Sequence, residues 1–140
     1  MNGPTISIIV ITYQRGEELG RCLRSIAEQR GLPPSVEVIL IDNAGDATID
    51  WEDTPNFTLR IERPSSNLGV AGGRNLGMSL ASGKLLLFID DDAEWETSTT
   101  ARHVLDLLQS APDIGAVALR SIRPETGETI VEELPHPDKV

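Results

Sequence analysis

The sequence has 140 residues, of which 39% are hydrophobic, and a formal net charge of −10 at pH 7; this length is typical of one domain with a buried core, and the acidic balance argues against nucleic acid or an anionic membrane surface as a partner. The single cysteine, Cys22, excludes an internal disulfide and a cysteine-based zinc site, and it fits a reducing compartment. The apolar run at residues 6–11 is too short for a signal peptide or a transmembrane segment, so we expect a cytoplasmic protein.

The first third of the chain predicts a β-α-β unit. Residues 6–12 (ISIIVIT) are rich in β-branched side chains, which indicates a buried strand. From Glu17, apolar residues recur at i, i+3, i+4, i+7 and i+8, the pattern of one helix face, and Gly31 is the expected stop. A second strand is expected at residues 36–41. The two strands should be parallel, with a right-handed crossover.

The middle of the chain predicts an exposed strand, a helix and a buried strand. Apolar and polar residues alternate from Phe57 to Glu62, which favours a half-exposed strand at the edge of the sheet. Residues 71–81 predict a helix terminated by Gly83. Residues 85–89 (LLLFI) form an unbroken apolar run, the pattern of a strand covered on both faces.

The last third predicts a helix ending before Pro112, a strand at residues 114–119, and a hairpin turn at residues 125–128 leading into a weak strand at 129–133. Residues 134–140 have little to bury and should fray. The expected fold class is therefore α/β, a three-layer α/β/α sandwich with a mainly parallel sheet, in one domain over residues 1–133.

Three consecutive acids follow the apolar run at residues 85–89. In an extended chain Asp90 and Asp92 project to one side and Asp91 to the other. Neighbouring carboxylates repel by roughly 3 kcal/mol at ~6 Å for an effective dielectric of ~20, and a divalent cation would relieve this. Carboxylate oxygens suit Mg²⁺ or Mn²⁺. The alternative is that the acids only decorate the start of the next helix.

Two more loops should leave the same edge of the sheet. The first contains Thr12, Tyr13 and Arg15, and the second begins at Asp42, which could accept a hydrogen bond from a base or ribose, or could simply cap a turn. In the segment GVAGGR, glycines permit close backbone approach, and Arg74 could reach a diphosphate or lie on the surface.

Four blocks occur in order along the chain: SIIVITYQR with a following helix that ends in SIAEQ, VEVILIDNAGDAT, NLGVAGGRNLGMSLASGK, and LLLFIDDDAEW. Together they resemble the nucleotide-sugar-binding half of the family 2 glycosyltransferases, which have the GT-A fold with a Rossmann-like sheet. The resemblance covers about residues 5–120. It implies nucleotide-sugar-binding residues Thr12, Tyr13, Arg15, Asp42, Arg74, Asp90 and Asp91. It also implies the metal ligands Asp92 and Asp90.

Within this set, the resemblance implies that Thr12 and Tyr13 line the nucleotide pocket, that Asp42 bonds the base and that Arg74 approaches the diphosphate. The implied reaction is metal-dependent, inverting transfer of a sugar from UDP or dTDP to a hydroxyl of a glycan, lipid or other acceptor, with Mn²⁺ or Mg²⁺ as cofactor. A full-length parent could associate peripherally with a membrane.

Family members carry their general base well beyond the aspartate strand, and only 48 residues follow Asp92 here. We therefore expect no catalytic residue in this chain, a base beyond Val140, and a GT-A domain truncated at its acceptor half. The alternative is a nucleotide-binding module without catalysis. A receiver-type phosphoryl-transfer protein would need a lysine beside the acids, and Lys84 and Lys139 are poorly placed for that role.

Overall fold

The computed structural model describes residues 6–49, 51 and 54–130. The chain divides into two compact units, Met1–Arg102 and His103–Val140. The first unit contains the sheet and every candidate site residue. Among the described residues, no helix combines the length and apolarity that crossing a membrane requires.

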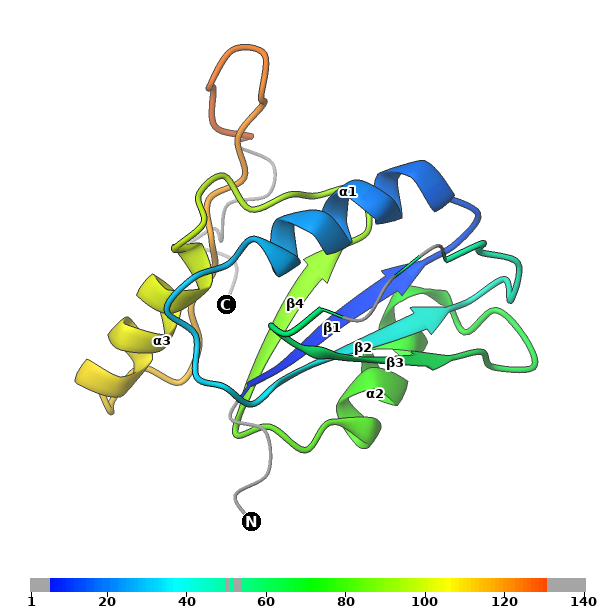
Figure 1. Ribbon diagram of the computed structural model, residues 1–140, viewed down its shortest axis with the longest axis horizontal. Coiled ribbons are helices and arrows are strands. Elements are labelled where there is room, and N and C mark those ends of the chain that lie inside the picture. Colours follow the sequence, from blue (N-terminus) through cyan, green and yellow to red (C-terminus); the bar gives the residue numbers. More distant parts are fainter. Residues whose placement is uncertain (1–5, 50, 52–53, 131–140) are drawn as a thin grey trace, which may run out of the picture. The chain divides into compact units, whose positions relative to one another are not determined.

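The first unit is built around a four-stranded parallel sheet (Figure 1). Its strands are β1 (Ile6–Thr12), β2 (Val36–Asp42), β3 (Thr58–Glu62) and β4 (Leu85–Asp90), in the order β3-β2-β1-β4. The predicted α/β fold class and the edge position of β3 are confirmed. In the parallel register Thr12 pairs with Asp42 and Ile11 with Asp90, so three strand ends lie side by side as expected.

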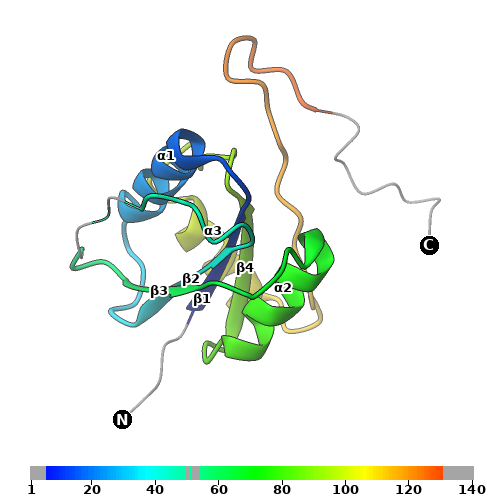
Figure 2. The ribbon, with the colours of Figure 1, turned by 90° about the vertical axis from the view of Figure 1, so that its right-hand side faces the viewer.

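Two helices lie on opposite faces of this sheet, α1 (Gly16–Ala27) and α2 (Gly69–Leu80) (Figure 2). Helix α1 buries Leu19, Cys22, Leu23 and Ile26, the positions that its sequence spacing predicts. Helix α2 packs on β1 and β2 through small residues. A Cβ atom added to Gly77 would lie 2.5 Å from Cγ2 of Ile9, so glycine sets the distance between helix and sheet.

Helix α1 ends earlier than the sequence predicts. It stops at Ala27 and not before Gly31, which lies beyond the helix with φ +71°. The amide of Gln29 bonds to the carbonyl of Ile26, three residues back, and the amide of Arg30 bonds to the carbonyl of Ser98 at 2.7 Å. A tertiary hydrogen bond therefore replaces the next helical one.

The expectation that β4 is covered on both faces is wrong. Leu86 and Phe88 are 39% and 43% exposed, whereas Ile89 is buried. Phe88 pairs with Ile9, and its side chain therefore lies on the face where α2 packs against β1 and β2. Strand β4 is the outer strand of the described sheet, and α2 does not extend over it as it does over β1 and β2.

Beyond the sheet, the predicted helix before Pro112 is present as α3 (Thr100–Ser110). The strand expected at residues 114–119 is not formed, because no described residue pairs with this segment and an unpaired strand leaves its backbone groups unsatisfied. The predicted turn is confirmed: Gly127 has φ +69°, and Ile122 bridges Thr129 in antiparallel fashion. Residues 131–133 of the expected weak strand lie outside the described residues.

Candidate functional site

The three aspartates lie at the carboxyl end of β4, where the strand turns. Strand β4 ends at Asp90, and the amide of Ala93 bonds back to the carbonyl of Asp90 at 3.0 Å. The extended chain on which the expected alternation depends does not continue past Asp90, and Nη1 of Arg15 contacts both Asp91 and Asp92. The three acids differ in exposure instead: the side chain of Asp91 is only 8% exposed, while those of Asp90 and Asp92 are 61% and 52% exposed. Two carboxylates thus face solvent on either side of a buried one.

The buried carboxylate of Asp91 is held by the loop that leaves β1. Oγ1 of Thr12 donates a hydrogen bond to Oδ2 of Asp91 at 2.8 Å, and the backbone of Tyr13 donates another. Burial raises the pKa of Asp91, while the hydrogen bond from Thr12 and the charge of Arg15 act in the opposite direction. Asp91 therefore ties the end of β4 to the end of β1.

Arg15 joins the same loop to two of the acids. Its Nη1 atom lies 2.5 Å from Oδ2 of Asp92 and 3.4 Å from Oδ1 of Asp91. The charge of Asp91, followed by the hydrogen bond to Asp92, raises the pKa of Arg15. The preceding residue, Gln14, has φ +57°, an uncommon value for a residue with a side chain, and Arg15 occupies the N-cap position of α1 without a capping bond from its side chain. This tight bend brings Arg15 to the aspartates.

Arg74 contacts the remaining acid from the other face of the sheet. Nη2 of Arg74 lies 2.9 Å from Oδ1 of Asp90, and both side chains are partly exposed. The preceding Gly73 packs closely on β1, since an added Cβ would lie 3.2 Å from Cγ2 of Ile11. Gly73 thus lets the start of α2 approach β1 closely enough for Arg74 to reach the strand end, and the sequence did not indicate Asp90 as its partner.

Asp42 is fully buried and has an extensive structural role. Its two oxygens accept hydrogen bonds from the amides of Gly45 at 3.0 Å and Ala47 at 3.2 Å, as a turn-capping aspartate does. Nε of Arg63 lies 3.1 Å from Oδ2 of Asp42 and forms an ion pair with it. The sequence analysis did not identify Arg63 as a candidate site residue. Its position directly after the edge strand could have indicated that it lies at the same end of the parallel sheet as Asp42.

Asn43 was also missed by sequence reasoning. Its side chain accepts a hydrogen bond from the amide of Leu68 at 3.3 Å and donates one to the carbonyl of Gly69 at 3.2 Å. It therefore fixes the start of α2 to the end of β2. An Asn directly after a buried strand was the available signal.

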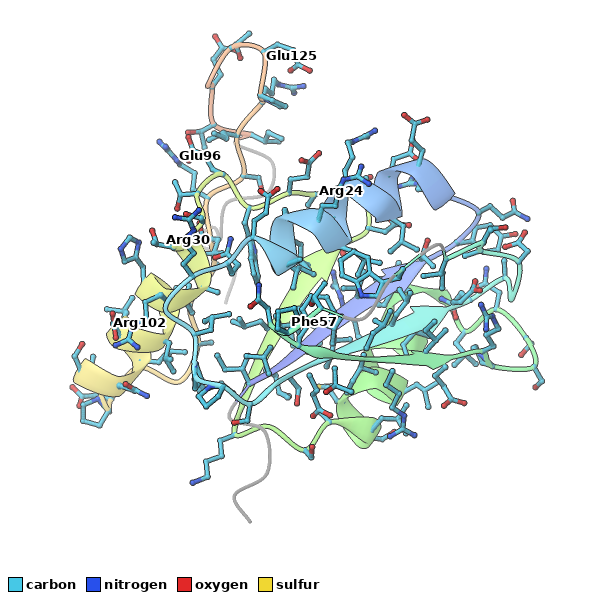
Figure 3. The ribbon with its side chains drawn as sticks, in the orientation of Figure 1. Arg24, Arg30, Phe57, Glu96, Arg102 and Glu125 are labelled. Atoms are coloured by element: carbon cyan, nitrogen blue, oxygen red, sulfur yellow. The ribbon has the colours of Figure 1, made fainter. Side chains whose placement is uncertain are left out.

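The segment after the aspartates is tied to α1 by polar contacts. Arg21 contacts Glu94 at 3.2 Å, the hydroxyl of Ser25 accepts from the amide of Trp95 at 3.3 Å, and Gln29 donates to the carbonyl of Thr97 at 2.8 Å. These side chains lie on successive turns of the helix or just after it, whereas Arg24 is exposed (Figure 3). Helix α1 therefore positions the acidic loop along its length, which no local pattern indicated.

Two hollows lie away from these acids. One of about 510 Å³ is bordered by the end of α1 and the start of β2, with Pro33, Pro34 and Phe57 in its wall, and another of about 590 Å³ runs beside α1 at Leu19 and Leu23. Neither wall includes a predicted site residue. The candidate site at the strand ends therefore does not coincide with either hollow.

Asp90 and Asp92 are the exposed carboxylates at this edge that could hold a hard cation. Within the described residues, no group of three His, Cys, Asp or Glu side chains is arranged to hold a metal ion. The two exposed carboxylates would therefore supply part of a ligand set, and water and substrate phosphates the rest, which is how Mg²⁺ is usually held. Their oxygen chemistry fits Mn²⁺ or Mg²⁺.

The chain was compared with known proteins. The family model described as glycosyl transferase family 2 matches residues 7–136. Abequosyltransferase RfbV of Salmonella typhimurium is 35% identical over 133 residues, which cover 91% of this chain and 38% of that protein. An uncharacterized glycosyltransferase of Haemophilus influenzae is 30% identical over 112 residues, covering 80% of this chain and 37% of the relative. The chain thus spans well under half of each relative.

Two solved structures share the fold. The mannosyltransferase PcManGT of Pyrobaculum calidifontis, in complex with GDP-Man and Mn²⁺, has a TM-score of 0.72 and 24% identity, covering 89% of this chain and 37% of that one. TarS of S. aureus, in complex with UDP-GlcNAc, has a TM-score of 0.65 and 20% identity, covering 84% of this chain and 37% of that one.

Proposed function

The chain belongs to glycosyl transferase family 2, and on that premise we propose that the acidic edge of its sheet binds a nucleoside-diphosphate sugar as the donor for transfer to an acceptor hydroxyl. The observation that carries this proposal is the grouping of two exposed carboxylates, Asp90 and Asp92, with two arginines, Arg15 and Arg74, at one sheet edge. Such a group can bind a divalent cation and an anionic diphosphate together, since it offers both charges. Ligands bind at this edge in open α/β sheets.

Each side chain has a part in this proposal. Asp92 and Asp90 would hold Mn²⁺ or Mg²⁺, and the bound cation would supply positive charge against the leaving diphosphate. Arg74 leaves Asp90 and approaches the diphosphate, because a guanidinium matches phosphate geometry. Asp91 acts through Thr12 and Tyr13, keeping the nucleotide-pocket loop against the strand end.

We place the nucleobase of the donor between the loop that contains Tyr13 and the loop that begins at Asp42. The Tyr13 side chain is 49% exposed and can pack against a ring. Asp42 already accepts three hydrogen bonds, and a carboxylate has about four acceptor sites. Asp42 is fully buried, and of its partners Arg63 is the half-exposed side chain. An N–H of the nucleobase would therefore reach Asp42 by displacing Arg63. UDP and dTDP are the proposed nucleotides.

The transfer step needs a general base that deprotonates the acceptor hydroxyl for in-line attack with inversion. We assign no described residue to that role. The acceptor is a glycan, a lipid or another hydroxyl compound. Transfer is therefore proposed for the whole transferase to which this donor domain corresponds.

Calorimetry tests donor binding directly. UDP and dTDP are titrated into the chain with Mn²⁺ and with EDTA, and we expect much tighter binding with Mn²⁺, because the cation offsets repulsion between the diphosphate and a chain at −10. Equal affinity in the two buffers would count against the proposed metal site. The matched control is Asp113→Asn, an exposed position in the second unit, which should keep the metal effect.

A nucleotide-binding module without transfer is the second candidate, because the described strand ends offer charged groups for a donor while no described residue is assigned as the base. The two candidates differ in turnover. Incubation with Mn²⁺, UDP- and dTDP-sugars and candidate acceptors should give no glycosidic product from this chain, apart from slow hydrolysis of the donor. If glycosidic product forms at a rate on the order of 1 s⁻¹ or more, the general base must be a carboxylate of this chain, such as Glu125 or Glu128.

A further inference from the structure

One nitrogen of Arg15 contacts two carboxylates that differ sharply in environment. Nη1 lies 3.4 Å from Oδ1 of Asp91, which is nearly buried, and 2.5 Å from Oδ2 of Asp92, which is half-exposed. Asp91 also receives hydrogen bonds from the hydroxyl of Thr12 and the backbone of Tyr13. For Asp92, the Arg15 guanidinium is the one hydrogen-bonding partner that the described residues show.

These two contacts should therefore have different persistence. Asp91 is held to the loop by the buried hydrogen bond from Thr12 and by the backbone of Tyr13, so its longer, part-buried contact with Arg15 is not needed to keep the loop in place. The contact with Asp92 is an exposed ion pair, a kind that contributes little to stability and is readily exchanged. Arg15 can release Asp92 while its loop stays anchored at Asp91.

We propose that Arg15 occupies the cation's place beside Asp92 while the donor is absent, and that binding of a divalent ion with a nucleoside diphosphate moves the guanidinium from Asp92 to the diphosphate. This inference rests on the proposed donor site. The exchange keeps charges matched at each stage: the guanidinium neutralises the acid first, and the metal does so afterwards. The released guanidinium then faces the new anion, for which it is a strong hydrogen-bonding partner.

The exchange can be distinguished from a direct contact between Arg15 and the diphosphate alone. If the exchange occurs, one substitution should raise the affinity for Mn²⁺ and lower the affinity for UDP. Arg15→Gln removes the competitor for Asp92, so the affinity for Mn²⁺ alone should rise by roughly two- to fivefold, the range that an exposed ion pair allows. The same substitution removes a contact with the diphosphate, so the affinity for UDP at saturating Mn²⁺ should fall by roughly tenfold.

Both affinities are measured by calorimetry on the full 140-residue chain, with the Mn²⁺-induced shift in melting temperature as a second readout. The matched control is Arg24→Gln, which makes the same charge change at an exposed position of α1 (Figure 3). It should leave both affinities unchanged. Arg15→Lys retains the charge and should partly restore both values, which a purely structural role would not predict.

Unchanged Mn²⁺ affinity in Arg15→Gln, or no Mn²⁺ binding by either protein, overturns the exchange. So does a fall in both affinities together, since that would make Arg15 only a support for the loop. If the wild-type chain binds UDP neither with nor without Mn²⁺, the donor site itself is wrong. Tight UDP binding combined with an unaltered Mn²⁺ affinity in Arg15→Gln refutes the exchange and leaves the donor site standing.

Discussion

Thr12 and Asp91, separated by 79 positions in the sequence, are joined by a 2.8 Å hydrogen bond from the Thr12 hydroxyl to a carboxylate oxygen of Asp91. Both side chains are buried at the end of the sheet. The bond links the loop after β1 to the turn after β4, together with the contacts that Tyr13 and Arg15 make to the same turn.

Replacing Thr12 with Val should destabilise the fold by about 1–3 kcal/mol, because a buried carboxylate loses its donor. The substitution should also raise the pKa of Asp91 further, since the hydrogen bond from Thr12 favours the charged form. Chemical denaturation and carboxyl NMR titration measure the two effects. Thr12→Ser keeps the hydroxyl and should stay close to wild type, and a Val variant with wild-type stability and pKa would show that the bond contributes nothing.

Replacing Asp92 with Asn should abolish the effect of Mn²⁺ on nucleotide binding, whereas Asp91→Asn should reduce it less. The reason is orientation: Asp92 faces solvent, while Asp91 is turned toward Thr12 and Arg15. Titration of UDP into each variant, with Mn²⁺ and with EDTA, measures the difference. A larger loss for Asp91→Asn than for Asp92→Asn would reverse the assignment of the metal ligand.

Replacing Gly77 with Ala should lower the free energy of unfolding by about 1–3 kcal/mol, the cost of overpacking a core. The new Cβ would lie 2.5 Å from Cγ2 of Ile9 and push α2 away from β1. Gly20→Ala is the contrasting substitution, because its Cβ would meet only the mobile end of Arg24 at 3.5 Å. Since Ala is the better helix former, Gly20→Ala should stabilise the chain by up to about 1 kcal/mol. Urea denaturation compares the two, and equal effects would contradict the packing argument.

Replacing Glu37 with Gln should destabilise the chain at pH 7 by about 1–2 kcal/mol, and less at pH 3. Burial pushes the pKa of Glu37 up, but hydrogen bonds from Ser7 and Ser82 outweigh it, and the net pKa is lowered. A lowered pKa in the folded state gives stability that is present above the unfolded pKa and is lost as the pH falls through the folded value.

Denaturation at several pH values measures this loss, with Glu28→Gln at the exposed end of α1 as the control. A destabilisation by Glu37→Gln that is the same at pH 3 and pH 7 would mean that the carboxylate charge has no part in the contact.

The sequence alone determined the main helices and strands and the edge of the sheet at which the candidate site residues lie. Apolar runs located β1 and β2, and apolar spacing located α1, because local sequence sets their buried faces. Residues that directly follow buried strands must emerge at the carboxyl edge. The position of Asp90, Asp91 and Asp92 at the carboxyl end of β4 could be predicted for the same reason, because they directly follow its apolar run.

Only the tertiary structure decided which partners these side chains meet. Arg63 on Asp42, Arg74 on Asp90 and Arg15 on Asp92 are contacts across the fold, and no spacing rule encodes them. The exposure of Leu86 and Phe88 follows from how far α2 extends over the sheet, and the end of α1 depends on the Ser98 carbonyl. Local sequence patterns specify which way a side chain faces, whereas its partner depends on how distant elements pack, and that is a property of the whole fold.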